Sequence, residues 1–190
     1  FEPQKKITHS AKTGQKLTIG AAGRFVEKKG FKTFIDAAAR VRKEFPEVEF
    51  VLAGDGPLSK SLLALSKSKG NPVRFTGWID IKEFAPSLDI FCLPSLDEPF
   101  GYILPEIMQY GVAIVATRTN GPLWICQSIE DALFFEPSNS DEMVDRLKIL
   151  IQNPKERNKY QQRAKQAVYD ERFSKEVFTE NLLNIIKVLN

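Results

Sequence analysis

The sequence predicts an α/β fold in which helices cover both faces of a parallel β-sheet. Two observations indicate this class. Short apolar segments alternate along the chain with longer segments whose apolar residues recur at helical spacing. The short segments are apolar at nearly every position, which is typical of parallel strands buried on both faces. A chain of 190 residues suits one domain of this kind.

The apolar segments are the predicted strands, and glycine-containing turns end the first three of them. The first ends at Gly23, the second at Gly54-Asp55-Gly56-Pro57 and the third at Gly77. The predicted strands cover residues 17–22, 48–53, 73–76, 90–94, 112–116 and 132–135.

Helical segments connect these strands. Phe31, Phe34 and Ala38 recur at helical spacing, and Pro46 ends their segment. Gly111 fits the left-handed position at the end of a helix. The predicted helices cover residues 31–45, 58–69, 81–86, 102–110 and most of 139–190, with breaks near Pro154 and Phe173.

Ligands of such sheets bind at the carboxyl ends of the strands, so function is expected in the loops that begin there. These loops cover residues 23–30, 54–57, 77–80, 94–101 and 117–122.

The composition excludes several classes of function. A net charge of +3 with pI about 8.8 is too mild to indicate nucleic acid, so we expect no nucleic-acid partner, while contact with an anionic membrane surface stays open. His9, the single histidine, lies in the polar leader, which argues against His-based triads and zinc sites. Cys92 and Cys126 lack CxxC spacing, which favours a reducing, cytoplasmic location.

The chain begins Phe-Glu-Pro without an initiator Met or a signal-peptide pattern. We expect a fragment in which residues 1–16 are a linker or the end of a preceding domain, and 17–190 form the domain itself. No apolar run approaches the roughly 18 residues of a membrane span.

The known phosphate-binding motifs are largely absent. No GxxxxGK[ST] pattern occurs, and the GxG at Gly54-Asp55-Gly56 lacks a third glycine, because Ser59 stands there. A tight turn after a strand is the simpler interpretation of that GxG. No DxD triplet occurs either, which argues against a diphosphate held through a divalent ion and predicts a site without metal or cofactor.

A diphosphate without a metal needs cationic side chains, and Arg24 and Lys29 come after the first strand. A guanidinium can bind two phosphate oxygens, and an ammonium adds a point charge. The alternative is a solvated basic loop.

A second candidate segment runs from Ser95 to Glu106, after the most apolar strand. Gly101 permits a close backbone approach to a ligand, and the N–H groups after it can receive a phosphate. Glu98 and Glu106 bracket the turn, and carboxylates accept hydrogen bonds from the hydroxyl pairs of sugars. The alternative is that both acids only favour the helix N-terminus.

Taken in order, these segments resemble the C-terminal domain of glycosyltransferase family 4, a retaining group with two facing Rossmann-like domains, the GT-B architecture. The resemblance covers about residues 17–190. It rests on Gly23-Arg24 to Lys29-Gly30, Ala53-Gly54-Asp55-Gly56-Pro57, Phe75-Thr76-Gly77, Pro94-Ser95 with Glu98-x7-Glu106, and Tyr110-Gly111-Val112 to Ala116-Thr117.

The resemblance implies catalytic roles for Arg24, Lys29 and Glu98. Arg24 and Lys29 match the family's diphosphate-binding pair, and Glu98 matches the acid near the hydroxyls of the transferred sugar. Glu106 matches the acid that binds the nucleotide ribose.

It further implies that donor binding involves Gly23 and the turn Phe100-Gly101-Tyr102, with the base pocket near residues 75–78. The expected partners are a nucleoside-diphosphate sugar, as substrate, and an N-terminal acceptor domain outside this chain. The expected reaction transfers a hexose-type sugar to a glycan, lipid or small molecule, as in polysaccharide or lipopolysaccharide biosynthesis. The expected location is the cytoplasm, and contact with the inner membrane surface stays open. Without the acceptor domain, this domain should be inactive.

Three positions depart from the family pattern: Trp124 replaces a usual acid, Ala113 replaces a common proline, and a glycine near residue 131 is missing. Two alternatives therefore stay open. One is a non-catalytic nucleotide- or phosphate-binding module of the flavodoxin type. The other is an interaction domain that keeps the fold without the site.

Overall fold

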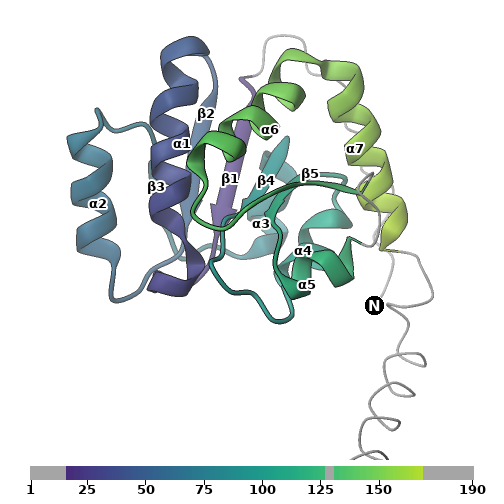
Figure 1. Ribbon diagram of the computed structural model, residues 1–190, viewed down its shortest axis with the longest axis horizontal. Helices are drawn as coiled ribbons and strands as arrows, with labels where there is room; N and C mark the ends of the chain where they lie inside the picture. Colours follow the sequence, from purple (N-terminus) through teal and green to yellow (C-terminus); the bar gives the residue numbers. More distant parts are fainter. Residues whose placement is uncertain (1–15, 127–130, 169–190) are drawn as a thin grey trace, which may run out of the picture.

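The structure is a computed structural model that describes residues 16–126 and 131–168. Six parallel strands form one sheet in the order β3-β2-β1-β4-β5-β6 (Figure 1). The order reverses between β1 and β4, as in doubly wound sheets. The strands are β1 (Thr18–Ala22), β2 (Glu49–Ala53), β3 (Arg74–Gly77), β4 (Ile90–Leu93), β5 (Ala113–Thr117) and β6 (Ala132–Phe135).

Helices cover both faces of this sheet, as the sequence predicts. Figure 1 shows α1 and α6 side by side over one face. The helices are α1 (Phe31–Glu44), α2 (Ser59–Ser68), α3 (Ile81–Phe84), α4 (Ile103–Met108), α5 (Asn120–Ile125), α6 (Ser140–Gln152) and α7 (Pro154–Ala167), with 3₁₀ turns η1 (Glu27–Lys29) and η2 (Ala85–Ser87).

The core consists of two layers, one on each face, because successive strand residues point to opposite sides. In β2, Phe50 and Leu52 belong to the layer under α1, α2 and α6, whereas Val51 and Ala53 belong to the layer under α3, α4 and α5. The burial of both faces explains why β1, β2, β4, β5 and β6 read as largely apolar runs, whereas the outer strand β3 is partly exposed and less apolar.

All six predicted strands are confirmed, with ends that differ by at most one residue. The sequence predicts a loop after β5, but Asn120–Ile125 forms α5. Gly121 and Pro122 conceal this helix in the sequence, although proline is compatible with a first helical turn. Gly111 has the predicted positive φ, of 70°, although α4 ends earlier, at Met108. The predicted break near Phe173 lies outside the described residues, as does nearly all of the predicted linker.

The core can be tested with two neighbouring leucines of α2. Leu62 is 1% exposed, whereas Leu63 is 50% exposed. We expect Leu62→Ala to lower the free energy of unfolding by about 2–5 kcal/mol, because it removes buried methyl groups and leaves a cavity. The matched control, Leu63→Ala, should change it by less than about 0.5 kcal/mol. Urea unfolding measures both, and equal losses would contradict the described packing.

Candidate functional site

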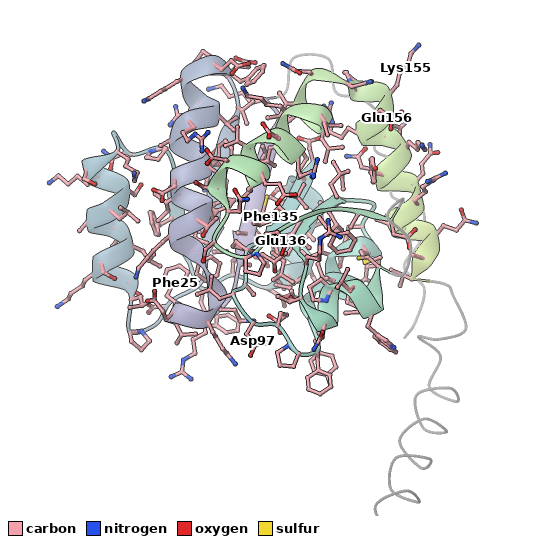
Figure 2. All side chains as sticks on the ribbon, in the orientation of Figure 1. Phe25, Asp97, Phe135, Glu136, Lys155 and Glu156 are labelled. Carbon is pink, nitrogen blue, oxygen red and sulfur yellow. The ribbon has the colours of Figure 1, made fainter. Side chains whose placement is uncertain are left out.

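The five loops that the sequence singles out lie along one edge of the sheet, because all strands run parallel. Figure 2 shows Phe25 of the first loop and Asp97 of the fourth at this edge, with Lys155 and Glu156 at the opposite end. Backbone hydrogen bonds of 2.7–3.0 Å join neighbouring loops or strand ends. The N–H to carbonyl pairs are Gly54 to Gly77, Gly23 to Ala53, Leu96 to Lys28, and Gly121 to Glu98.

A very close contact at this edge lies between the β1 loop and the β4 loop, at Gly30. Gly30 has a φ of 63°, and a Cβ built on it would lie 1.9 Å from the carbonyl oxygen of Pro94. Only glycine fits both the left-handed conformation and this distance. The contact brings Lys29, at the end of η1, directly over the β4 loop.

Lys29 and Glu98 form an ion pair between these two loops. The Lys29 ammonium donates to Oε2 of Glu98. The same oxygen accepts from the Ser95 hydroxyl at 3.1 Å, and Oε1 accepts from the Gly101 N–H at 3.3 Å. Glu98 is only 8% exposed, and Ser95 is fully buried. The carboxylate is therefore held from three directions.

Two opposing effects set the pKa of Glu98. Burial is the larger single effect and raises the pKa, but the hydrogen bond and charge of Lys29, with the Ser95 and Gly101 donors, together outweigh it and lower the pKa. Glu98 is therefore ionised at neutral pH. These specific partners go beyond a general preference of an acid for a helix N-terminus.

Arg24 lies on the same loop as Lys29, and its side chain is exposed. Within residues 16–126 and 131–168 the guanidinium makes no hydrogen bond or ion pair. A cation in this state can bind an incoming anion without first losing a partner. The two cations thus differ: the Arg24 guanidinium has no partner among the residues that the structure describes, whereas the Lys29 ammonium is already oriented by Glu98.

Glu106 lies in the first turn of α4 and is exposed. Its carboxylate has no partner among the described residues, although its backbone carbonyl accepts from Gln109 at 3.0 Å. The two acids of the E-x7-E element therefore have different environments. Glu98 is buried and ion-paired, whereas the Glu106 carboxylate is open to a ligand.

Aromatic rings lie exposed at the turn between these acids. Phe100 and Tyr102 flank Gly101 and stack with ring centroids 5.3 Å apart. They are 61% and 65% exposed. The backbone of Gly121 in α5 packs against Phe100, since a Cβ there would lie 2.6 Å from the Phe100 carbonyl carbon. The turn is thus fixed by α5 while its rings stay open to solvent.

The Gly54-Asp55-Gly56 segment forms a tight turn. Asp55 accepts a hydrogen bond from the Gly56 N–H at 2.7 Å and one from the Ser59 hydroxyl, and these contacts lower the pKa of Asp55. A Cβ on Gly54 would lie 1.9 Å from the carbonyl oxygen of Gly23. These contacts are internal to the fold and explain the glycines without a ligand.

Sequence reasoning gave no role in the site to Ser95 or Gly121, although both lie in segments that it singled out. Ser95 comes directly after a buried strand, which is a signal, but its bond to Glu98 depends on how the loop folds back. Gly121 comes shortly before the departing residue Trp124, and its N–H bond to the Glu98 carbonyl is a tertiary contact that the sequence does not display.

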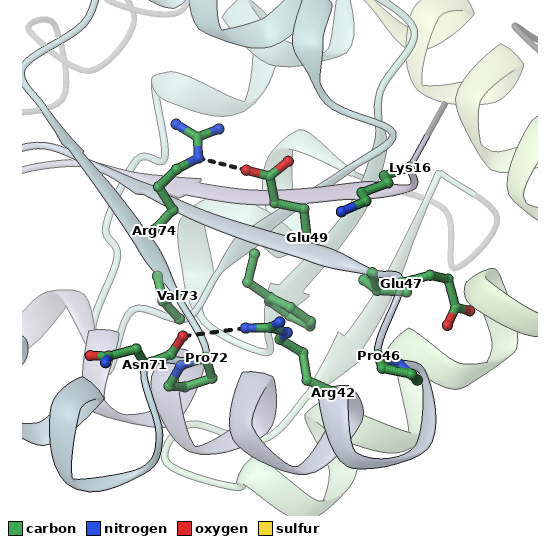
Figure 3. Close-up of a pocket in the computed structure, with 11 residues that line it drawn as sticks. Lys16, Arg42, Pro46, Glu47, Glu49, Asn71, Pro72, Val73 and Arg74 are labelled. Atoms are coloured by element: carbon green, nitrogen blue, oxygen red, sulfur yellow. Dashed lines mark hydrogen bonds and ion pairs between the residues drawn. The ribbon is translucent and has the colours of Figure 1, made fainter. Parts of the chain in front are cut away.

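A pocket of about 270 Å³ lies at the opposite edge of the sheet, near the starts of β2 and β3 (Figure 3). Its two guanidinium groups already have partners. Arg42 donates to the carbonyl oxygen of Asn71 at 3.2 Å, and Arg74 pairs with Glu49 at 2.5 Å. No residue of the predicted site lines this pocket, so we place the candidate site at the carboxyl edge.

Within residues 16–126 and 131–168, no cluster of His, Cys, Asp and Glu side chains could hold a metal ion. In the same part of the chain, no helix is long and apolar enough to cross a membrane.

The doubly wound parallel sheet, with its polar residues at the carboxyl edge, defines a Rossmann-like domain of the kind that forms one half of a GT-B enzyme. Residues 3–167 match the family described as Glycosyl transferases group 1, and the chain belongs to this family.

Curated relatives agree with this assignment. The chain is 31% identical over 171 residues to the lipopolysaccharide core biosynthesis glycosyltransferase LpsE of Rhizobium meliloti, a match that covers 88% of this chain and 49% of LpsE. It is 30% identical over 143 residues to the 2-deoxystreptamine N-acetyl-D-glucosaminyltransferase of Niallia circulans, covering 73% of this chain and 37% of that protein. The chain thus spans half or less of the length of these relatives.

Solved structures share the fold. The C-terminal domain of the group 1 glycosyl transferase LpcC from Francisella tularensis superposes with a TM-score of 0.74 at 30% identity, over 80% of this chain and 84% of that one. Anabaena HepE in complex with UDP and glucose gives a TM-score of 0.79 at 21% identity, over 91% of this chain and 48% of HepE, which is evidence for the fold alone.

The contact at Gly30 can be tested against a second left-handed glycine. Gly70 has a φ of 82°, and a Cβ placed on it would meet no atom within 4 Å, so Gly70→Ala should cost only the left-handed strain of about 1–2 kcal/mol. Gly30→Ala adds a collision with Pro94 and should cost about 1–3 kcal/mol more. Urea unfolding measures both free energies, and equal costs would contradict the close approach of the two loops.

The ion pair predicts a pH dependence of stability. Because the pKa of Glu98 is lowered from its usual 4.5, its contacts stabilise the fold fully above that pH and lose this effect as the pH falls below it. The stability difference between the parent protein and Glu98→Gln should therefore be largest at about pH 7 and shrink by about pH 3.5. Unfolding titrations at both pH values measure this, and a constant difference would argue against the pair.

Proposed function

We propose that this chain is the donor-binding domain of a retaining glycosyltransferase that uses a nucleoside-diphosphate sugar. The observation that carries the proposal is the arrangement at the carboxyl edge. Arg24 and Lys29 supply two cations from one loop, and Glu106 supplies an open carboxylate from the helix α4. A nucleoside diphosphate needs both: positive charge for its phosphates and an acceptor for its ribose hydroxyls.

The leaving diphosphate gains negative charge as the bond to the sugar breaks. Arg24 and Lys29 would stabilise that charge, and donors placed in advance for this purpose are often the largest catalytic contribution, worth on the order of 10²–10³ in rate for a single donor. With two cations in this role, we propose a transfer without a metal cofactor.

The proposed transfer moves a hexose-type sugar with retention of anomeric configuration. Glu98, with Phe100, Gly101 and Tyr102, would lie beside the sugar, while Gly23 and the residues near Trp78 would border the phosphates and base. The names of LpsE and the Niallia enzyme support a glycan, lipid or small-molecule acceptor. The acceptor would bind a second domain outside this chain, at the cytoplasmic surface of the membrane.

Nucleotide binding tests this proposal directly, and the crystallised LpcC domain is a precedent for studying such a domain as a separate chain. We expect UDP, GDP or ADP, without added metal, to raise the melting temperature, because a ligand at 100 times its dissociation constant adds about 2.7 kcal/mol. Glu106→Ala and Arg24→Ala should each weaken binding about tenfold or more, since each removes a charged hydrogen-bonding group.

Two exposed residues at the opposite edge of the sheet, close to the start of β2, provide matched controls. Glu47→Ala and Lys43→Ala remove the same types of charge away from the site and should leave the affinity within about twofold. A parent protein that binds none of the three nucleotides, with or without Mg²⁺, would contradict donor binding by this domain. Binding that needs Mg²⁺ would contradict only the metal-free part of the proposal.

A further inference from the structure

Lys29 requires a fixed position if it is to bind phosphate, yet its flexible side chain does not provide one. A free lysine carries about 2 kcal/mol of rotamer entropy, which must be lost when it binds. In this protein the ammonium is already bonded to Glu98, and the Lys29 side chain is 22% exposed. Since an ammonium has three donors, the two that remain can bond to a ligand.

Glu98 is a suitable anchor because it is itself immobilised. Its Oε2 accepts from Ser95, its Oε1 accepts from the Gly101 N–H, and its backbone carbonyl accepts from the Gly121 N–H at 2.8 Å. The carboxylate therefore cannot follow Lys29 to another position. The immobilised Glu98 carboxylate therefore holds the flexible Lys29 side chain in place.

We propose that Glu98 is a positioning residue that orients the Lys29 ammonium for diphosphate binding, and that Ser95 supports it by holding Glu98 Oε2. This inference rests on the proposed function, because it assigns the diphosphate to Lys29. It gives Glu98 a role in binding the nucleotide that does not require the sugar.

Simple electrostatics gives the opposite expectation. Glu98 is an anion near the proposed diphosphate, so neutralising it would strengthen phosphate binding if charge alone mattered. A carboxylate that only contacts sugar hydroxyls would leave the affinity for a sugar-free nucleotide unchanged. Of these three possible roles of Glu98, only the positioning role predicts that Glu98→Gln weakens the binding of a nucleoside diphosphate.

The experiment measures binding by calorimetry for the diphosphate among UDP, GDP and ADP that the chain binds, and for its monophosphate. We expect Glu98→Gln to weaken diphosphate binding about tenfold, with a smaller effect on the monophosphate. Lys29→Ala should weaken it by at least as much. The double variant should bind no more weakly than Lys29→Ala, because the Glu98 effect acts through Lys29.

Two further variants keep the result interpretable. Glu27→Gln removes one negative charge from the same loop, where Glu27 pairs with Lys32 at 2.7 Å, and should leave the affinity within about twofold. Ser95→Ala deletes one hydrogen bond to Glu98 and should weaken diphosphate binding about threefold, which provides the test if Glu98→Gln does not fold.

Unchanged or tighter diphosphate binding by Glu98→Gln would overturn the inference while leaving the proposed function intact. Additive losses in the double variant would overturn it in the same way. A parent protein that binds no nucleotide would instead overturn the proposed function, and this inference with it.

Discussion

The arrangement of this site depends on one close contact between two loops, where Gly30 passes directly over the carbonyl of Pro94. A side chain at that position would separate the β1 loop from the β4 loop. The contact, together with the Leu96 N–H bond to the Lys28 carbonyl, holds the end of η1 over the segment that carries Ser95 and Glu98. A backbone constraint thus determines which charged side chains meet.

The electrostatics of the site depend on this contact. Glu98 could not remain buried and ionised without compensating donors, because taking a carboxylate out of water is costly. Lys29 and Ser95 supply that compensation, with the Gly101 N–H. Arg24 and Glu106 stay exposed and lack side-chain partners among the described residues, so they remain available to a ligand. The site therefore combines a rigid buried pair with two open charges.

Much of the fold is predictable from local patterns. The strands other than β3 are recognisable because both of their faces are buried, which makes their sequences largely apolar. The helix α1 is recognisable from the spacing of Phe31, Phe34 and Ala38. The helix α5 escapes prediction because Gly121 and Pro122 disfavour helix by local propensity. Its place is fixed by tertiary contact, since Gly121 lies against the backbone of Glu98 and Phe100.

The sequence by itself determined the sheet and its parallel direction, the edge of the sheet that carries the candidate site, and the resemblance that pointed to the family. Those properties depend on periodicity and on motifs of neighbouring residues, which the chain displays directly. Only the tertiary structure decided that Lys29 pairs with Glu98 and that Ser95 supports the pair, whereas Arg24 and Glu106 stay open. Lys29 and Glu98 are far apart in the chain, and their contact depends on how two loops pack, which no local pattern encodes.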